Sequence, residues 1–291
     1  MTTYLERLAA RSGAVGTVLC LGLDPDPDAL PAGFGRDVAG VEAFARVALE
    51  ACLPFVAAVK PNLAFYEAFG SRGIAALERL RALVPADVPV ILDGKRGDIG
   101  STSARLAVAL FGALGADAIT LNPYLGRAAI LPLLERADRF SYLLCRTSNP
   151  GADELQGLAV GDPGQAGGPE PARETLAVRV ARAVAAWPEA SAGTVGLVVG
   201  ATAPAELAAI RAAVPGLAFL VPGLGAQGGD LEAVRRAGPA AVPPGGGRAG
   251  GGLVVNVGRA ILGAAGTAPG DPADALAAAA RNWSARLAVL A

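Results

Sequence analysis

Eight short apolar runs recur along the chain, and each is bounded by polar or turn-forming residues. Their length and nearly unbroken hydrophobicity are typical of strands buried on both faces of a parallel sheet. Helix-like stretches separate them. The apolar runs span 17–23, 55–59, 88–92, 116–121, 141–145, 194–199, 217–221 and 253–257. The helix-like stretches span about 40–52, 66–84, 101–114, 127–137, 172–187, 203–213, 229–237 and 272–289.

This alternation predicts the α/β class and a parallel sheet closed into a (β/α)8 TIM barrel. A doubly wound open sheet also alternates, so the count alone does not exclude that fold.

Two segments are irregular: residues 149–171 have the composition of a long loop, and residues 238–252 are of low complexity. Neither breaks the repeat, so residues 1–291 are expected to form one domain. Thr3 and Glu6 form a possible capping box before a short amphipathic helix, which is not the pattern of a signal peptide.

Polar side chains gather directly after the predicted strands. In a (β/α)8 barrel the carboxyl ends of all strands share one rim, where active sites are built. We therefore expect these residues to meet at one mouth: Asp24, Lys60, Asn62, Asp93, Lys95, Asp98, Asn122, Thr147, Ser148, Gln227 and Arg259.

The use of basic residues singles out two of these positions. The chain has 25 Lys and Arg residues, and only Lys60 and Lys95 are lysine. Arginine does not release its proton in a protein, whereas a lysine ammonium is a compact donor whose pKa responds to its surroundings. The chain has no histidine, so acid–base chemistry falls to Asp, Glu, Lys or Tyr. Both lysines are therefore candidates for proton transfer or for a close charge contact.

Composition argues against several classes of protein. The net charge of −1 gives no electrostatic reason to expect a nucleic acid or an anionic membrane as partner. No apolar stretch approaches the roughly 18 residues that a membrane-spanning helix needs. Cys20, Cys52 and Cys145 are odd in number, far apart and set in apolar segments, which predicts buried free thiols in a reducing compartment, the cytoplasm. No ligand spacing indicates a metal site.

The segment D-G-K-R-G-D, residues 93–98, ends the third predicted strand. Alternate side chains of an extended chain share a face, so Asp93 and Lys95 should both point into the mouth. Lys60 comes from the second strand, and Asp98 follows a turn. We expect the four residues to form an alternating array in which opposite charges keep every group ionised. A purely structural ion-pair network is the alternative, but burying four charges for stability alone is unfavourable.

Seven segments make the chain resemble the orotidine 5′-phosphate decarboxylase family, and within it the longer bacterial (type 2) subgroup. The resemblance implies decarboxylation of orotidine 5′-phosphate (OMP) to UMP and CO2, the last step of de novo pyrimidine nucleotide synthesis, without a metal or organic cofactor. Gly94 stands where the family pattern has Ala. The segments are L-C-L-G-L-D-P-D (19–26), V-K-P-N-L-A-F-Y-E (59–67), V-I-L-D-G-K-R-G-D-I-G-S-T (90–102), D-A-I-T-L-N-P-Y-L-G (117–126), R-T-S-N-P-G (146–151), V-P-G-L-G-A-Q-G-G-D (221–230) and V-N-V-G-R-A-I-L (255–262).

The resemblance also implies residue roles. Lys60, Asp93, Lys95 and Asp98 would be catalytic, with Asp93 against the substrate carboxylate and Lys95 protonating C6. Asp98, with Thr102, would reach across the interface of a homodimer into the partner's site. Asn62 either touches the ligand or only supports Lys60. The implied substrate contacts are Asp24 at the ribose, Ser148 at the pyrimidine, Gln227, Gly258 and Arg259 at the phosphate, and Asn62, Ile99, Thr102 and Pro222 around them.

Other functions are open at this point. A Mg²⁺-dependent sugar-phosphate decarboxylase or lyase on the same barrel shares D-x-K-x-x-D, but such enzymes place an acidic group where Lys60 stands. A Schiff-base aldolase fits less well, because neighbouring aspartates keep Lys95 charged rather than nucleophilic. A catalytically silent nucleotide-binding barrel would be free to lose a member of the charged array, and none is lost.

Overall fold

The computed structural model describes residues 2–161, 174–241, 249–267 and 270–288. Eight parallel strands form its centre: β1 (Leu19–Leu23), β2 (Ala58–Pro61), β3 (Ile91–Arg96), β4 (Ala118–Leu121), β5 (Phe140–Arg146), β8 (Val195–Val199), β9 (Ala218–Val221) and β10 (Val254–Val257). Their order in the sheet is β2-β1-β10-β9-β8-β5-β4-β3. Bridges between Val59 and Val90 and between Asn62 and Asp93 connect β2 to β3. The sheet therefore closes on itself, and the predicted barrel is confirmed.

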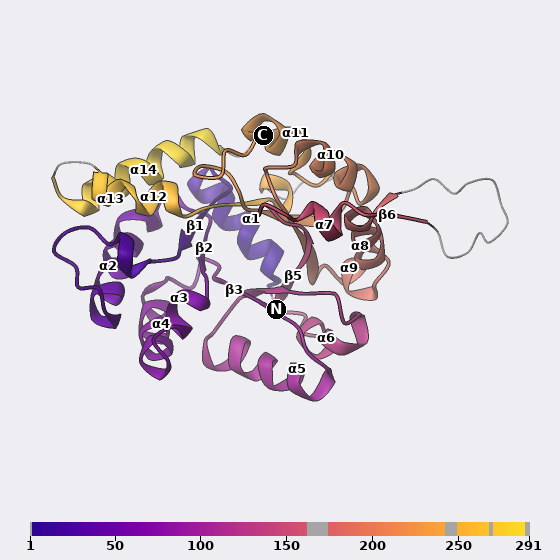
Figure 1. The fold of residues 1–291 in the computed structure, drawn as a ribbon, viewed down its shortest axis with the longest axis horizontal. Helices are drawn as coiled ribbons and strands as arrows, with labels where there is room; N and C mark the ends of the chain where they lie inside the picture. The colour runs from indigo at the N-terminus through magenta and orange to yellow at the C-terminus, as the bar shows by residue number, and fades with distance from the viewer. Residues whose placement is uncertain (1, 162–173, 242–248, 268–269, 289–291) are drawn as a thin grey trace.

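Helices surround the strands and follow one another around the barrel in chain order (Figure 1). The main ones are α2 (Val38–Cys52), α4 (Ser71–Leu83), α5 (Gly100–Ala107), α6 (Arg127–Leu134), α8 (Leu176–Ala185), α10 (Pro204–Ala213), α11 (Leu231–Ala237) and α14 (Pro272–Arg286). Shorter ones are α3 (Ala64–Glu67), α9 (Pro188–Ala192), α12 (Arg259–Leu262) and α13 (Ala264–Thr267). A π-helical turn, Val108–Ala113, extends α5. Turns of 3-10 helix lie at Pro27–Ala29, Leu53–Phe55 and Ala249–Gly252.

Several predicted elements have different bounds in the structure, and two of these differences have a clear physical reason. The second strand begins at Ala58 because Leu53–Phe55 forms a 3-10 turn, although Val56 and Ala57 are fully buried. Hydrophobicity alone does not separate a buried loop from a strand. The single helix expected at 66–84 is two helices, divided at Gly70, whose φ of 61° is rare for any residue with a Cβ atom.

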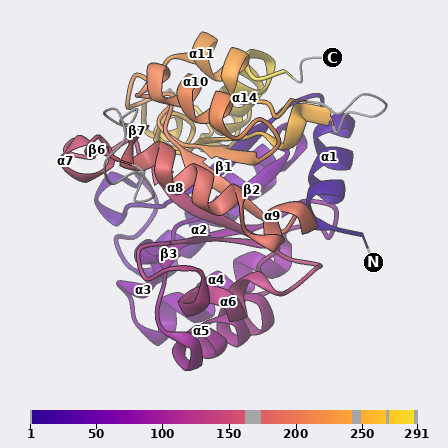
Figure 2. The ribbon, with the colours of Figure 1, turned by 90° about the vertical axis from the view of Figure 1, so that its right-hand side faces the viewer.

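Helix α1 (Tyr4–Val15) closes the amino-terminal end of the barrel. Its predicted capping box is confirmed, since Glu6 N donates to Thr3 Oγ1 at 3.3 Å and Thr3 N donates to Glu6 Oε2 at 2.7 Å. Tyr4, Leu5 and Leu8 pack against the inward-facing side chains of the strands. Figure 2 shows α1 at one end of the barrel and α7 (Asp153–Gln156), with the hairpin of β6 (Ala159–Val160) and β7 (Glu174–Thr175), at the other.

The barrel interior changes from apolar to polar along the strands. Near the amino-terminal end, the inward side chains are small or apolar and belong to one buried cluster, which includes Cys20, Ala58, Ile91 and Ala118. Two residues further along β2, β3 and β4, the side chains are Lys60, Asp93 and Thr120, all buried. Strand alternation places them on the same inward face as the apolar residues before them. The polar mouth therefore stands on an apolar floor.

Further predictions from the sequence concern the cysteines, the irregular segments and membrane-spanning helices. Cys20, Cys52 and Cys145 are free and buried, as predicted. The irregular segment 149–171 contains α7 and β6, and its residues 162–171 lie outside the described part. Residues 242–248 of the segment 238–252 lie outside it as well. Among the residues that the structure describes, no helix combines the length and hydrophobicity that crossing a bilayer requires.

Candidate active site

One carboxylate lies between two ammonium groups at the barrel mouth. Lys60 Nζ donates to Asp93 Oδ2 at 2.6 Å, and Lys95 Nζ donates to Asp93 Oδ1 at 2.7 Å. The Lys60 side chain is 4% exposed and that of Asp93 is 11% exposed, whereas the Lys95 side chain is 46% exposed. Lys60 is therefore a buried counter-ion, and Lys95 is the lysine that a molecule in the mouth can reach.

The charges within this cluster support one another. Burial by itself would raise the pKa of Asp93, but the positive charges of Lys60 and Lys95 and their hydrogen bonds outweigh it and hold that pKa well below its usual range. Burial would lower the pKa of Lys60, but the charges of Asp93 and Asp24 outweigh it and raise that pKa. Asp93 is therefore ionised and Lys60 protonated near neutral pH, as expected from the sequence.

Asp98 does not join this cluster within one chain. Its carboxylate oxygen Oδ1 accepts from the backbone N–H of the next residue, Ile99, at 2.7 Å. Asp98 lines neither of the two cavities at the mouth, and no Lys or Arg of the described residues pairs with it. The structure thus brings together three members of the predicted array, Lys60, Asp93 and Lys95, and leaves the fourth at its edge.

Asp24 lies beside the cluster at the end of β1. Its Oδ1 atom accepts from the backbone N–H of Asn62 at 3.1 Å, which connects the ends of β1 and β2. Burial raises the pKa of Asp24, while the nearby charge of Lys60 acts in the opposite direction without cancelling the effect. Asn62 turns its side-chain oxygen to the backbone of Ala64 at 3.1 Å and also lines the mouth. Both of its expected roles are therefore compatible with its position.

Two adjoining cavities share the walls formed by Lys60, Asp93, Lys95 and Pro222. The smaller has a volume of about 240 Å³ and is lined mainly by polar groups: Asp24, Asn62, Gly223, Leu224, Ala226, Gln227, Asn256, Gly258 and Arg259. The larger, of about 400 Å³, combines apolar and polar walls: Thr120, Leu144, Thr147, Ser148, Asn149, Gln156, Val198 and Leu220. The charged cluster therefore lies where a polar compartment meets a more apolar one.

Two of the predicted ligand-contacting residues touch each other across the mouth. Ser148, after β5, donates its hydroxyl to Gln227 Oε1, after β9, at 3.1 Å. Arg259 begins α12 and is exposed, and no carboxylate among the described residues pairs with it. Its guanidinium is therefore available to an anion in the smaller cavity. Ile99 and Thr102 lie at the start of α5, and both are exposed outside the two cavities.

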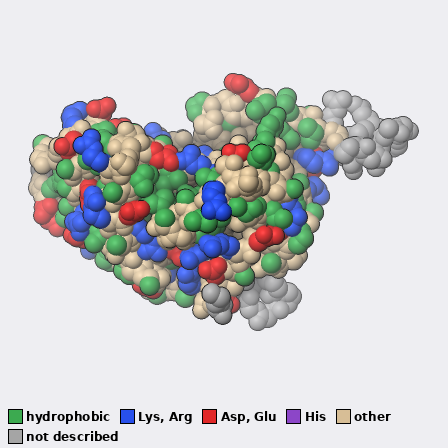
Figure 3. Space-filling model, turned by 90° about the horizontal axis from the view of Figure 1, so that it is seen from below, with side chains coloured by type: hydrophobic (Ala, Val, Ile, Leu, Met, Phe, Trp, Pro, Cys, Tyr) green, Lys and Arg blue, Asp and Glu red, His purple; other side chains and the backbone are tan. Residues whose placement is uncertain are grey.

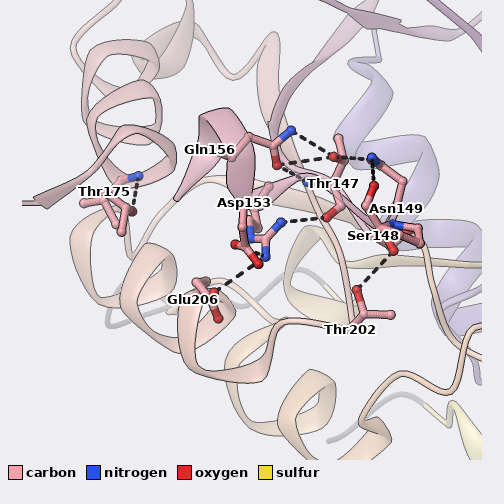
Figure 4. Close-up of polar contacts among 11 residues, drawn as sticks. Thr147, Ser148, Asn149, Asp153, Gln156, Thr175, Thr202 and Glu206 are labelled. Atoms are coloured by element: carbon pink, nitrogen blue, oxygen red, sulfur yellow. Dashed lines mark hydrogen bonds and ion pairs between the residues drawn. The ribbon is translucent and has the colours of Figure 1, made fainter. Parts of the chain in front are cut away.

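The wall that carries Ser148 is held by Thr147, which was predicted at the mouth, and by Arg146, Asn149, Asp153 and Gln156, to which the sequence reasoning gave no role. Thr147 N donates to Gln156 Oε1 at 2.8 Å, and Thr147 Oγ1 donates to Asn149 Oδ1 at 2.6 Å (Figure 4). Arg146 Nη2 donates to Asp153 Oδ1 at 2.8 Å and so fastens α7 to the end of β5. In Figure 4, Gln156 points from α7 toward Thr147. The residues 149–156 thus form an ordered wall of the larger cavity.

Thr120 and Asn256 were also missed by the sequence reasoning, although both lie in segments that carry the resemblance. Thr120 Oγ1 donates to Asp93 Oδ1 at 2.8 Å. Asn256 lines the smaller cavity, and its buried Oδ1 atom has no hydrogen-bond partner in the described part of the chain. The available signal was a single polar side chain inside an otherwise apolar strand.

Gly94, the departure from the family pattern, lies against the side chain of Leu63. A Cβ atom at this position would lie 2.7 Å from Cδ1 of Leu63. Leu63 is buried at 2% exposure, so alanine would require its side chain to shift.

Comparison with known proteins places the chain in a family. Residues 17–269 match the family model described as "Orotidine 5'-phosphate decarboxylase / HUMPS family". The chain is 47% identical over 261 residues to the orotidine 5′-phosphate decarboxylase of Thermomicrobium roseum, covering 89% of this chain and 86% of that one. Among solved structures, OMP decarboxylase from Leishmania donovani superposes with a TM-score of 0.78 and 36% identity, covering 97% of this chain and 95% of the other.

A longer protein contains the same barrel. Leishmania donovani UMP synthase superposes with a TM-score of 0.81 and 37% identity over 99% of this chain, and this chain spans 56% of its length. The family match and the level of identity together decide the assignment. This chain is a member of the orotidine 5′-phosphate decarboxylase / HUMPS family.

Proposed function

We propose that this protein decarboxylates orotidine 5′-phosphate to UMP and CO2, the last step of de novo pyrimidine nucleotide synthesis. The observation that carries the proposal is Asp93 held between Lys60 and Lys95 at the mouth of a barrel of this family. Breaking the bond between C6 and the carboxylate leaves an electron pair on C6. A site for this reaction must favour that developing negative charge over the ground-state carboxylate.

The cluster has the charges that this step requires. Asp93, next to the substrate carboxylate, disfavours the ground state by repulsion, and this repulsion is relieved when CO2 leaves. The Lys95 ammonium stabilises the electron pair on C6 and then transfers a proton to it. The C6–carboxylate bond is replaced by a C6–H bond, and solvent returns a proton to Lys95. Lys60, which is buried, keeps Asp93 ionised throughout.

The two cavities divide the substrate between them. We assign the ribose phosphate to the smaller cavity, where the ribose would contact Asp24 and Asn62. The phosphate would be held by Gln227, Arg259 and the backbone near Gly258, since the loops after the seventh and eighth barrel strands are the usual phosphate site of this fold. The pyrimidine would lie in the larger cavity against Ser148 and Pro222, with C6 toward Lys95.

The site would be completed by a second copy of the chain. Asp98, Ile99 and Thr102 stand outside the cavities of their own chain, at the start of α5. Exposed apolar side chains follow β3 and β4: Ile99 is 64% exposed and Tyr124 is 87% exposed. Figure 3 shows hydrophobic side chains among charged ones on the side of the molecule where α5 lies. We therefore propose a homodimer in which each subunit lends these residues to its partner's site.

We further propose that residues 1–291 act as one domain in the cytoplasm, with neither a nucleic acid nor a membrane as partner. Three buried free thiols are consistent with a reducing compartment. Basic and acidic side chains are interspersed on the face in Figure 3, which gives a polyanion no continuous basic surface there.

The proposal is tested by incubating the purified protein with orotidine 5′-phosphate and following the loss of orotate absorbance, with UMP and CO2 quantified as products. Stoichiometric UMP supports it. The rival is a Mg²⁺-dependent decarboxylase or lyase of sugar phosphates, tested in parallel with Mg²⁺ and 3-keto-gulonate 6-phosphate. No cluster of three metal-ligating side chains occurs among the described residues, and Lys60 occupies the rival's acidic position. Turnover of the sugar phosphate, together with no turnover of orotidine 5′-phosphate, would overturn the assignment.

A further inference from the structure

Thr120 lies opposite an irregularity in the pairing of β3 with β4. Leu92 pairs with Ile119 and Arg96 pairs with Leu121, so the stretch of β3 between those pairs is longer than the stretch of β4 that it faces. Bulges of this kind re-aim side chains and are frequent beside active sites. Here the extra length contains Asp93 and Lys95, and the residue of β4 that faces it is Thr120.

The Thr120 hydroxyl connects the two residues that the bulge presents. It accepts from the backbone N–H of Lys95 at 2.9 Å and donates to Asp93 Oδ1 at 2.8 Å. A hydroxyl has one proton to donate, and a backbone amide is only a donor. The direction of both bonds is therefore fixed. Thr120 is 2% exposed, so water has little access to replace either bond.

Lys95 has an unusual backbone conformation at this point. Its φ is +48°, and within the described part of the chain it is the sole non-glycine residue with a positive φ. L-residues with a Cβ atom disfavour this region, which persists where surrounding contacts hold it and is frequent at active sites. The Thr120 hydroxyl is one such contact, because it binds the amide of the strained residue itself.

Thr120 is also the neutral donor among the side chains that hold Asp93. Oδ2 accepts from Lys60, and Oδ1 accepts from both Lys95 and Thr120. During the proposed reaction Lys95 must direct its ammonium to C6 and give up a proton. The bond from Lys95 to Oδ1 weakens at that moment, while the bond from Thr120 does not depend on it.

We propose that Thr120 is a positioning residue for this reaction, holding the Asp93 carboxylate and the backbone of Lys95 in the geometry in which the ammonium faces C6. The inference rests on the proposed decarboxylation. Thr120 lines the larger cavity but is only 2% exposed, and its hydroxyl is already bound to Asp93 and to the Lys95 backbone. Its loss should therefore slow the chemical step more than it weakens substrate binding.

The test compares Thr120→Val, which keeps the shape and removes the hydroxyl, with Thr120→Ser, which keeps the hydroxyl. We expect kcat of Thr120→Val to fall at least about tenfold, the effect of losing a hydrogen bond to a charged group. The KM should change less than about threefold, because binding and chemistry separate in this way when an interaction acts mainly in the transition state. Thr120→Ser should restore kcat to within about threefold of wild type.

Thr194→Val is the matched control. Thr194 is a buried threonine that precedes β8 at the opposite end of the barrel, and its hydroxyl donates to Leu134 O at 3.3 Å. Its loss should lower the melting temperature and leave kcat unchanged. If Thr120→Val does not fold, Thr120→Ala removes the hydroxyl without placing a methyl group against the Asp93 carboxylate. The inference is wrong if the variant that lacks the hydroxyl has the same kcat as wild type. It is also wrong if the Ser and Val variants lose kcat equally. In either case, turnover by the wild-type protein would leave the proposed function intact.

Discussion

The Nζ atom of Lys60 lies 2.6 Å from Oδ2 of Asp93, and this buried pair is the base of the candidate active site. Lys95 binds the other oxygen of the same carboxylate at 2.7 Å. Asp93 therefore contacts both ammonium groups, and the nearby charge of Asp24 also supports Lys60. Lys95 is the exposed ammonium of the cluster, and it is the group that we propose faces the negative charge developing on C6. The proposed reaction would thus use charges that are in place before the substrate arrives.

The two carboxylates of the mouth should give stability opposite dependences on pH. The pKa of Asp93 is lowered in the folded state, so its contribution to the free energy of unfolding is present above about pH 4 and is lost as the pH falls. The pKa of Asp24 is raised by burial, so its contribution is present below about pH 4 and is lost as the pH rises through the raised pKa.

Urea denaturation of wild type, Asp93→Asn and Asp24→Asn between pH 3 and pH 7 measures both effects. The stability advantage of wild type over Asp93→Asn should shrink as the pH falls. Its advantage over Asp24→Asn should grow as the pH falls. Parallel slopes for the two variants would contradict the electrostatic description of the mouth.

Arg259 should accelerate the reaction by binding the substrate phosphate. Binding this remote group can hold the pyrimidine against Lys95, and the free energy of that contact can lower the barrier of the reaction. Arg259→Ala should lower kcat/KM by the worth of a charged hydrogen bond, about 1.5–3 kcal/mol or roughly tenfold to a hundredfold. The loss should nearly vanish for orotidine, which lacks the phosphate. Equal losses on the two substrates would show that Arg259 does not bind the phosphate.

The proposed sharing of sites between subunits predicts complementation. Lys95→Ala and Asp98→Ala should each be nearly inactive alone. After subunit exchange at equal concentrations, each heterodimer of an isologous pair contains one intact site, so roughly a quarter of all sites should recover. The measurement is the specific activity before and after exchange, with exchange itself followed by mass spectrometry of two size-tagged chains. If exchange is demonstrated and no activity returns, Asp98 either acts in the site of its own subunit or takes no part in catalysis.

Turnover should not depend on a metal ion. The proposed chemistry uses the charges of Lys95 and Asp93, and no step requires a Lewis acid. Exhaustive chelation followed by metal analysis should leave the rate with orotidine 5′-phosphate unchanged. A loss of activity that Mg²⁺ restores would favour the sugar-phosphate enzymes of the same barrel.

Periodicity indicated the eight strands because every buried parallel strand requires an apolar run of its own. The polar residues after those strands then favoured a closed barrel over a doubly wound sheet. Periodicity misplaced the start of β2, since Val56 and Ala57 are as buried in the preceding loop as residues of a strand. It also placed Asp93 and Lys95 on one face correctly, although the bulge opposite Thr120 interrupts regular alternation there.

The wall of the larger cavity could not be predicted in the same way. Gln156 and Asp153 belong to a short helix without apolar periodicity, and their contacts to Thr147 and Arg146 depend on how the segment folds back. Thr120 was quoted in a matching motif but given no role, because its importance comes from the register of two strands. Asp98 illustrates the limit of one chain, since its proposed partner is in another subunit.

Replacement of Lys95 is the most direct experiment on the proposed proton transfer to C6. Because its side chain is 46% exposed, removing it should cost less than the roughly 3–5 kcal/mol typical of breaking a fully buried pair, and the protein should fold. The measurement is the rate of UMP formation from orotidine 5′-phosphate by Lys95→Ala, with circular dichroism and a urea titration to establish folding. We expect a folded protein with no measurable decarboxylation. Near wild-type turnover by a folded Lys95→Ala protein would contradict this expectation.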